Sequence, residues 1–490
     1  MDMSSLFPPV AWQGNSLKNT GVDRGKNCGV NVKSNWNWKR PENIYFLISL
    51  FFGILLVFIT PPYQIPDERA HFYRANQIAE GEFFYPEGEI MSSVIDFTAE
   101  IYKFDLNFKP QNKISKITLV EELFRSLDKD TKVVFTDTKT NNYSAINYLP
   151  QAVGIVIGKI LKFSPYKLVL VSRIINLLVG IFLTTAAITI SPIRKWSFVF
   201  IGLLPMALYQ YASISPDAFV ISLCIFYLAL VLYMQTQDKT EVKMLALAIV
   251  ITLSMALTKP GYVFLCFLIL LVPIIRGKKK YDFFIKGVII LATLTLFVVW
   301  FSFSINNTPD IDPLVKGMDQ KAQLEFVMNN PLGFVQTLAN DLITDFGYIT
   351  EMFIGKFGWL DTRLPNYFYW VYSIALIAVF LFDNNYEGRL TTGSRVLLLA
   401  TFALIFLGTY TTFYIIFTPV GANYISGFQG RYLLPIIGLL FISGYNKHKL
   451  FSFKKIYLLL PIWAIGGFTT LVTVINRYYV TASIFKLVDK

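Results

Sequence analysis

Apolar runs long enough to cross a bilayer recur along this chain, and they constrain its fold more than any other feature. A spanning helix needs about 20 mostly apolar residues, and only a helix or a closed barrel satisfies its backbone polar groups in hydrocarbon. Such runs begin near residue 43 and continue almost to the C-terminus. The composition, 54% hydrophobic and 16% charged, is far from that of a soluble domain. The sequence therefore predicts an all-α, polytopic transmembrane protein.

Two long polar stretches interrupt the apolar runs. Residues 61–142 follow the first span, at 43–60, and contain helical patterns around Glu100 and at 119–127 and a strand-like KVVFTDT. Residues 305–366 contain helical patterns at 319–329 and 334–346. Stretches of this length exceed simple connections, so we expect two sizeable loops with structure of their own. The remaining apolar segments are residues 145–161, 167–190, 196–212, 217–234, 244–258, 261–275, 283–304, 367–382, 394–417, 432–444 and 456–476.

The distribution of positive charge assigns the two sides of the membrane. The net charge is +12, and Lys and Arg cluster in short loops between apolar runs, which is the positive-inside pattern and not a nucleic-acid footprint. The basic loops are all cytoplasmic only if one early segment does not cross. Segment 145–161 is the candidate, because it is short, contains Gly154 and Gly158, and ends in lysines. We predict about eleven crossings plus one embedded or re-entrant helix; alternatively, this segment spans and one near Tyr432 is miscounted.

This topology divides the chain into three parts. Residues 1–42, rich in Asn, Gly, Ser and Lys, are predicted to form a flexible tail, which the basic residues before the first span place in the cytoplasm. Residues 43–476 form the transmembrane domain, with loops 61–142 and 305–366 outside. Residues 477–490 form a short external tail.

The stretch PPYQIPDERAHFYRANQIAEG, residues 61–81, follows the first span directly. Pro66 suits a first helical turn and Gly81 suits the position just past a helix end, so a helix is expected from near residue 67. Ionisable groups held close to a membrane are usually functional, although first-turn acids also complement the helix dipole and Arg also meets headgroups. Helical spacing gathers four such groups on two neighbouring faces: Asp67, Glu68, His71 and Arg74.

Three later junctions between apolar segments also carry polar residues, and the predicted topology puts all three outside. They are Asp217 after Ser215-Pro216, Lys259 before Pro260, and Arg431 after Gln429-Gly430. None was used to choose the topology, so their common side indicates a single outward-facing site. Each also has a structural explanation, a helix cap for the carboxylate and headgroup contact for the two cations.

A carboxylate beside converging cations suits transfer of a group from a lipid phosphate. Asp67 is the predicted base for the acceptor hydroxyl, and Glu68 offsets the helix dipole, which would weaken that base. Lys259 and Arg431 are predicted phosphate contacts. A donor carried on a lipid would enter such a site sideways from the bilayer. The other predicted substrate-binding residues are His71, Arg74, Asp217 and Gln429.

The second loop adds KFGWLDTRLP, residues 356–365. In it, Trp359 and Asp361 suit stacking on and hydrogen bonding to a sugar, although interfacial aromatics are also common at membrane surfaces. The three cysteines indicate neither a disulfide framework nor a metal cluster. No metal ligands are assigned and no cofactor is identified, although the neighbouring carboxylates leave a divalent cation open. The sequence has no P-loop and no G-x-G-x-x-G after a strand, which argues against an ATP-driven pump and against a cytoplasmic nucleotide-sugar enzyme.

In order along the chain, PPYQIPDERAHFYRANQIA, LLPMALYQYASISPDAF, TKPGYVFL, GKFGWLDTRLP and QGRYLLPI resemble a family of bacterial polytopic membrane proteins catalogued as a domain of unknown function. That family is grouped with the GT-C superclass of membrane glycosyltransferases. The resemblance implies a polyprenyl-phosphate-linked sugar donor, transfer with inversion, an essential acid at Asp67, and a second acidic position at Asp217. Members of that superclass have amphipathic helices in the first external loop, which fits the interpretation of residues 145–161 as an embedded helix.

We therefore expect a glycosyltransferase of the bacterial cytoplasmic membrane that acts on an external glycan or lipid acceptor. The alternatives are a transporter or flippase of glycans and an envelope polysaccharide polymerase. A transporter would favour charges deep in the spans and repeated halves, which the sequence does not show clearly. The expected partners are membrane lipid, the lipid-linked sugar and the acceptor, with no nucleic acid.

Overall fold

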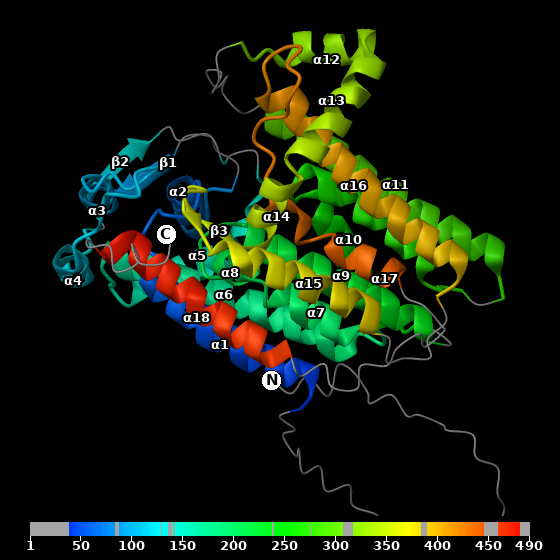
Figure 1. Ribbon diagram of the computed structural model, residues 1–490, viewed down its shortest axis with the longest axis horizontal. Coiled ribbons are helices and arrows are strands. Elements are labelled where there is room, and N and C mark those ends of the chain that lie inside the picture. The colour runs from blue at the N-terminus through cyan, green and yellow to red at the C-terminus, as the bar shows by residue number, and fades with distance from the viewer. Residues whose placement is uncertain are drawn as a thin grey trace, which may run out of the picture.

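The computed structural model describes residues 39–83, 88–128, 130–135, 140, 143–237, 240–275, 277–306, 317–383, 390–444 and 459–480. Over these ranges the chain is a helical bundle with two short antiparallel hairpin-like sheets, as the all-α prediction requires (Figure 1). Five described helices are both long and apolar enough to cross a membrane: α1 (Pro41–Ile59), α6 (Pro165–Ile190), α9 (Asp217–Thr236), α11 (Lys279–Asn306) and α16 (Thr392–Phe417).

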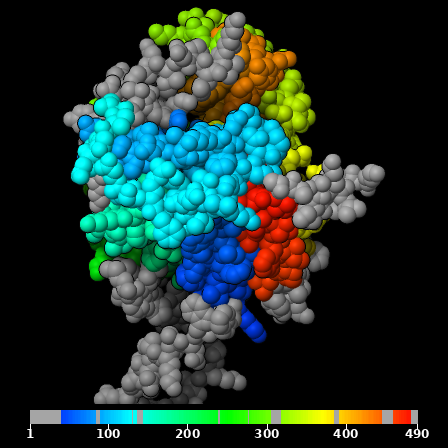
Figure 2. Space-filling view, turned by 90° about the vertical axis from the view of Figure 1, so that its left-hand side faces the viewer, coloured from blue at the N-terminus to red at the C-terminus, as the bar shows by residue number. Residues whose placement is uncertain are grey.

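The bundle is centred on α9, the most enclosed of these helices. Its most apolar window is 89% buried, whereas those of α11 and α16 are only 17% and 22% buried. A helix that is apolar on all sides and still exposed needs an apolar solvent, so the outer faces of α11 and α16 are suited to lipid. Helices α1 and α18 (Leu460–Tyr479) pack side by side along another edge (Figures 1 and 2).

Three segments that we predicted as continuous spans have a different local structure. Residues 196–212 divide into α7 (Lys195–Gly202) and α8 (Pro205–Tyr211), and residues 432–444 divide into η5 (Gly430–Leu433) and α17 (Ile437–Ser443). Prolines at 205 and 435 explain both breaks, because proline lacks an N–H and clashes with the preceding turn. Residues 261–275 contain a 3₁₀ helix, η4 (Pro260–Leu271), instead of an α-helix. The remaining apolar helices follow the prediction closely: α10 (Val242–Ala256) and α15 (Asn366–Phe382).

The first long loop folds into a layer at one end of the bundle. Its elements are α2 (Glu68–Ala79), β1 (Gly88–Met91), α3 (Ser92–Tyr102), α4 (Lys116–Phe124) and β2 (Lys132–Phe135). Both predicted helices and the strand are therefore confirmed, although the TDT part of the strand motif lies outside the described residues. β1 pairs antiparallel with β2, from Gly88 opposite Phe135 to Met91 opposite Lys132. In Figure 2 this layer covers the face above α1 and α18.

Segment 145–161 forms η3 (Ala145–Tyr148) and α5 (Leu149–Ile160) and lies along α2. At its start, Tyr148 hydrogen-bonds His71 in the first turn of α2. At its end, Lys159 forms an ion pair with Glu80, which closes α2. Twelve residues of helix span about 18 Å, so α5 and α2 run together and both ends of α5 stay near the first loop.

The second long loop forms an arm and a small hairpin. The arm consists of α12 (Gln320–Asn329) and α13 (Pro331–Thr344), which stand at the top of Figure 1, and α14 (Phe346–Gly355), which leads back to the bundle. We predicted the first two helices but not α14. Buried Asp341 fixes the arm, because it accepts hydrogen bonds from the Tyr410 hydroxyl of α16 and from Ile425 N. The hairpin pairs β3 (Lys356–Phe357) with β4 (Thr362–Arg363).

Candidate functional site

Asp67 occupies an unusual backbone position at the start of α2. It is the residue before the first helical turn, its φ is +62°, and its side chain is exposed and does not cap the helix. Left-handed backbone is uncommon outside glycine, and Asp and Asn are among the residues that tolerate it best. At the other end, Gly81 adopts φ +90°, as expected for a residue just past a helix. The carboxylate of Asp67 is thus presented outward by a rigid turn.

Glu68, the next residue, points the other way into a completely buried ion pair. Its two carboxylate oxygens accept hydrogen bonds from Nε and Nη2 of Arg173 in α6, at 2.8 and 2.6 Å. The same oxygens accept from the backbone N–H groups of Tyr63 and Ile214. Both side chains have no exposed surface. Glu68 is therefore placed to hold this loop together. We predicted that its carboxylate offsets the effect of the helix dipole on Asp67, and both oxygens of that carboxylate already accept hydrogen bonds from other groups.

Arg173 extends the same network to the end of α1. Its guanidinium donates to the carbonyl oxygens of Val57 and Thr60, at 3.2 and 2.6 Å, and to that of Pro61, at 3.0 Å. The last carbonyls of a helix have no partner within the helix, so a cation there is favourable. This pair, which we call the Glu68–Arg173 clamp, connects α1, α6 and the turn that carries Asp67.

A second charged group gathers the three later junctions. Asp217, the first residue of α9, forms an ion pair with Lys259, which precedes η4, and lies 3.5 Å from Nε of Arg431 in η5. All three side chains are at least four-fifths buried. We call these residues the Asp217 cluster. Its charges sum to +1, because two cations surround one carboxylate.

Tyrosines enclose the Asp217 cluster. Lys259 Nζ lies 5.7 Å from the ring centre of Tyr143 and 5.1 Å from that of Tyr432, and Arg431 also packs on Tyr432. Burial opposes the charge on Lys259, but Asp217 and these tyrosines hold the pKa of Lys259 above its ordinary value. The site therefore keeps its cations charged in a desolvated setting, where electrostatic interactions are strong.

Asp67 and His71 belong to the same neighbourhood as the Asp217 cluster. The charge of Asp67 acts on the pKa of Tyr143 and of Arg431. His71 Nδ1 lies 2.9 Å from the hydroxyl oxygen of Tyr148. Burial lowers the pKa of His71 to about 3, and Lys259 and Arg431 act in the same direction while Asp217 opposes them. His71 is thus neutral over the physiological range.

Backbone groups around Asp217 are fixed by amides from two other helices. Gln151 of α5 donates to the carbonyl oxygens of Ile214 and Ser215, at 3.3 and 3.2 Å. Asn176 of α6 donates to those of Ser213 and Ser215, at 2.8 and 3.1 Å. The start of α9 is therefore held from two sides, as preorganised sites require.

Several buried polar atoms in this region have no hydrogen-bond partner among the described residues. They include Asp217 Oδ2, Arg431 Nε, Gln429 Oε1 and Asn147 Oδ1. Desolvated polar atoms without hydrogen-bond partners cost about 1–3 kcal/mol each. Because they are rare in folded proteins, several of them in one place need an explanation. A polar ligand supplies such a reason.

The other predicted site residues have their described contacts elsewhere. Arg74 donates to the carbonyls of Phe83 and Glu82, at 2.6 and 3.3 Å, and so fixes the exit from α2. Trp359 donates from Nε1 to Tyr63 O at 3.3 Å, and Asp361 pairs with Arg477 of α18 at 2.7 Å. The hairpin therefore connects α18 with the turn before Asp67. The described contacts of Trp359 and Asp361 do not include a residue of the Asp217 cluster.

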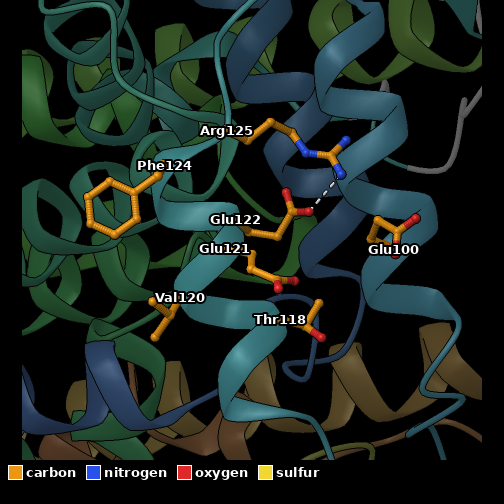
Figure 3. Close-up of a pocket in the computed structure, with 7 residues that line it drawn as sticks. All are labelled: Glu100, Thr118, Val120, Glu121, Glu122, Phe124 and Arg125. Atoms are coloured by element: carbon orange, nitrogen blue, oxygen red, sulfur yellow. Dashed lines mark ion pairs between the residues drawn. The ribbon is translucent and has the colours of Figure 1, made fainter.

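A surface hollow lies between α3 and α4 (Figure 3). Glu122 points into it and forms an ion pair with Arg125 at 2.8 Å. None of its lining residues belongs to the Asp217 cluster. Among the described residues, no group of three or more His, Cys, Asp or Glu side chains is arranged to hold a metal ion.

Sequence reasoning missed the residues that support the charged groups. Arg173 had a visible signal, because a single cation inside an apolar span is expensive and usually has a reason. Tyr143, Tyr148 and Tyr432 had none, since tyrosines are common wherever a membrane protein meets water.

Comparison with known proteins identifies a family for this chain. No curated protein and no solved structure matches the chain. Residues 50–440 match the family described as predicted membrane protein (DUF2142). This match covers most of the chain and includes α2, the Glu68–Arg173 clamp and the Asp217 cluster. The protein therefore belongs to this family of predicted membrane proteins.

Proposed function

We propose that this protein is a membrane glycosyltransferase of the GT-C type. It moves a sugar from a polyprenyl-phosphate donor to a glycan or lipid acceptor of the bacterial cell envelope. One observation carries the proposal: the charge of an exposed carboxylate, Asp67, acts on a desolvated cluster that has a net charge of +1 and polar atoms without hydrogen bonds. That charge complements a phosphodiester, which carries one negative charge.

The proposed reaction uses the two parts differently. The Asp67 carboxylate takes the proton from the acceptor hydroxyl, whose oxygen forms a bond to the anomeric carbon of the sugar. The bond between that carbon and the phosphate oxygen breaks, and the leaving phosphate keeps the electron pair. Lys259 and Arg431 stabilise the charge that develops on this phosphate. Attack from the face opposite the phosphate gives inversion.

The proposed topology places the site outside a bacterial cytoplasmic membrane, with the N-terminus in the cytoplasm. The contacts of α5 support its assignment as an embedded helix, because both of its ends are tied to α2. Its exposed apolar side chains, among them Val153, Ile157 and Ile160, also suit contact with lipid at the interface. With α5 not crossing, the charge rule gives eleven crossings and an external site.

Purified protein in lipid nanodiscs, incubated with candidate polyprenyl-phosphate sugars and extracts of envelope glycans, should release polyprenyl phosphate. The Asp67→Asn variant should lose at least 100-fold in rate, since a positioned base typically contributes 10²–10⁴-fold. Asp96→Asn is the matched control, because Asp96 is an exposed carboxylate on α3 of the same loop. Full turnover by Asp67→Asn would contradict the proposed base.

A glycan flippase is the competing function, and the same nanodisc preparation separates the two. Conversion to proteoliposomes allows movement of a labelled lipid-linked sugar to be followed without an acceptor. Movement that is unaffected by Asp67→Asn, together with no release of polyprenyl phosphate, would favour the flippase. A polymerase differs only in its acceptor, and product length would identify it.

A further inference from the structure

The hydrogen bond between His71 and Tyr148 defines which nitrogen of His71 carries a proton. The Tyr148 hydroxyl is fully buried, and among the described residues its one hydrogen-bond partner is His71 Nδ1, at 2.9 Å. A buried phenol O–H needs an acceptor, because an unpartnered donor is costly. Tyr148 therefore donates, Nδ1 accepts, and the proton of the neutral imidazole lies on Nε2.

The Nε2–H of His71 is then a hydrogen-bond donor for which the described residues supply no acceptor. His71 is 93% buried, with 7% of its surface exposed. The charged groups close enough to act on its pKa come from three other elements: Asp217 of α9, Lys259 before η4 and Arg431 of η5. Tyr143 also packs near its ring, with centres 6.3 Å apart. An acceptor bound at Nε2–H would therefore lie near two cations.

We propose that His71 binds a ligand phosphate as a neutral hydrogen-bond donor through Nε2–H, next to Lys259 and Arg431, and that Tyr148 fixes this tautomer. This inference rests on the proposed function for the identity of the ligand. It also gives His71 a role distinct from that of a base. A base would need an unprotonated nitrogen toward the substrate, whereas here that nitrogen accepts from Tyr148.

The electrostatic surroundings favour the same state. Burial and the two cations keep His71 uncharged, while Asp217 alone would favour protonation. A neutral donor adds a hydrogen bond without adding a third positive charge to a cluster that already has two. A phosphodiester with one negative charge is then matched in charge and in hydrogen bonding.

The chain has only two histidines, which makes a direct measurement practical. In the His448→Gln variant, ¹⁵N-labelled histidine reports on His71 alone. His448 lies outside the described residues. In phosphatidylcholine nanodiscs, NMR should show a proton on Nε2 and none on Nδ1, unchanged between neutral and mildly acidic pH. A proton on Nδ1, or titration near the ordinary histidine pKa, would overturn the proposal.

Ligand addition tests the second half of the inference. Undecaprenyl phosphate should shift the Nε2–H proton resonance downfield, and inorganic phosphate in a parallel sample tells whether the anion alone suffices. A shift with either supports the proposal, and a shift with neither overturns it. Both readouts need no turnover, so they can succeed or fail independently of the glycosyltransferase assay.

Two variants separate the donor role from a structural one. Tyr148→Phe removes the hydroxyl that fixes Nδ1, so the spectrum should show a mixture of both tautomers. His71→Gln places an amide near Nε2 and should retain more phosphate binding than His71→Asn, whose shorter amide replaces Nδ1. Equal loss in both variants would indicate that His71 acts only through packing, and would overturn the donor assignment.

Discussion

The Glu68–Arg173 clamp and the Asp217 cluster are two buried groups of charges near the turn that carries Asp67. They differ in how many of their polar atoms have hydrogen-bond partners. In the Glu68–Arg173 clamp, each carboxylate oxygen has two donors, and the guanidinium reaches three backbone carbonyls. In the Asp217 cluster, Asp217 Oδ2 and Arg431 Nε face each other at 3.5 Å without a hydrogen bond. The clamp has a net charge of zero, whereas the cluster has a net charge of +1.

This difference separates a structural ion pair from a candidate binding site. A buried ion pair is tolerated when hydrogen bonds satisfy its remaining lone pairs and protons, and such a pair needs no ligand. A buried group with surplus charge and unpartnered atoms remains destabilised until something binds. The two acids of the PDE motif therefore differ: Glu68 is buried and holds the turn, whereas Asp67 is exposed and its charge acts on Arg431 of the cluster.

The largest effect on stability should come from breaking the clamp. Glu68→Gln leaves the Arg173 guanidinium buried without a counter-charge, and loss of one partner of a buried pair costs about 3–5 kcal/mol. Thermal unfolding in detergent should show a large drop in midpoint, with poor yield from membranes.

Glu100→Gln provides the control, because Glu100 also pairs with a cation, Lys103, but at an exposed position. It should leave the unfolding midpoint unchanged. A wild-type midpoint for Glu68→Gln would show that the clamp does not stabilise the fold, and the contrast with the Asp217 cluster would then fail.

The next effect should come from moving the backbone that carries Arg431. Gly430 packs η5 directly against α14, and an added Cβ would lie 2.1 Å from Ile349 O and 2.6 Å from Phe353 N. Gly430→Ala therefore forces the two backbones apart, at a cost of about 1–3 kcal/mol. Because Arg431 follows immediately, phosphate binding should weaken as well.

Gly347→Ala tests the same helix, α14, at a position where a Cβ meets nothing within 4 Å. It should be neutral or stabilising by up to about 1 kcal/mol. If both variants behave alike in unfolding and in phosphate titration, the close approach at Gly430 is not important for the site.

An effect that builds up gradually should appear in the pH dependence of stability. The pKa of His71 is about 3 in the folded protein, below its ordinary value of 6.5. Between these values the unfolded chain binds the extra proton, so stability rises with pH through this window and levels off above it. The slope contributed by His71 is about 1.4 kcal/mol per pH unit.

Carboxylates titrate in the same window, so the useful quantity is the difference between wild type and His71→Gln. Unfolding free energies measured across the window should converge as the pH falls, because only the wild type loses the histidine contribution. Parallel curves would show that His71 is protonated as easily in the folded protein as in the unfolded chain.

The sequence was informative wherever structure depends on local pattern. Apolar length located α1, α6 and α9, and turn residues located both ends of α2. The three polar junctions were recognised because charges next to spans are costly. By contrast, the breaks in segments 196–212 and 432–444 were missed, although Pro205 and Pro435 were visible signals of them.

What the sequence did not reveal is mostly pairing between distant segments. The partner of Glu68 lies 105 residues away in α6, and the partner of His71 lies 77 residues away in η3. No local period encodes such pairs. Asp361 is a further example, because the sequence around it, with Trp359 nearby, gives no sign of its ion-pair partner, Arg477 of α18.

The smallest effect on stability should come from Asp67, and it separates backbone strain from chemistry. Its φ of +62° suits Gly, is tolerated by Asn and strains Ala, which pays about 1–2 kcal/mol for this conformation. The unfolding midpoints of Asp67→Gly and Asp67→Asn should therefore be close to that of the wild type, and the midpoint of Asp67→Ala should be the lowest. Transfer activity should be lost in all three, since each lacks the carboxylate.

Leu360→Gly is the backbone control, because Leu360 also has a φ of +62° but lies in the hairpin. It should be as stable as the wild type and active. If activity instead followed the order of the midpoints, Asp67 would act through the shape of the turn, and the division of roles between the two acids would be wrong.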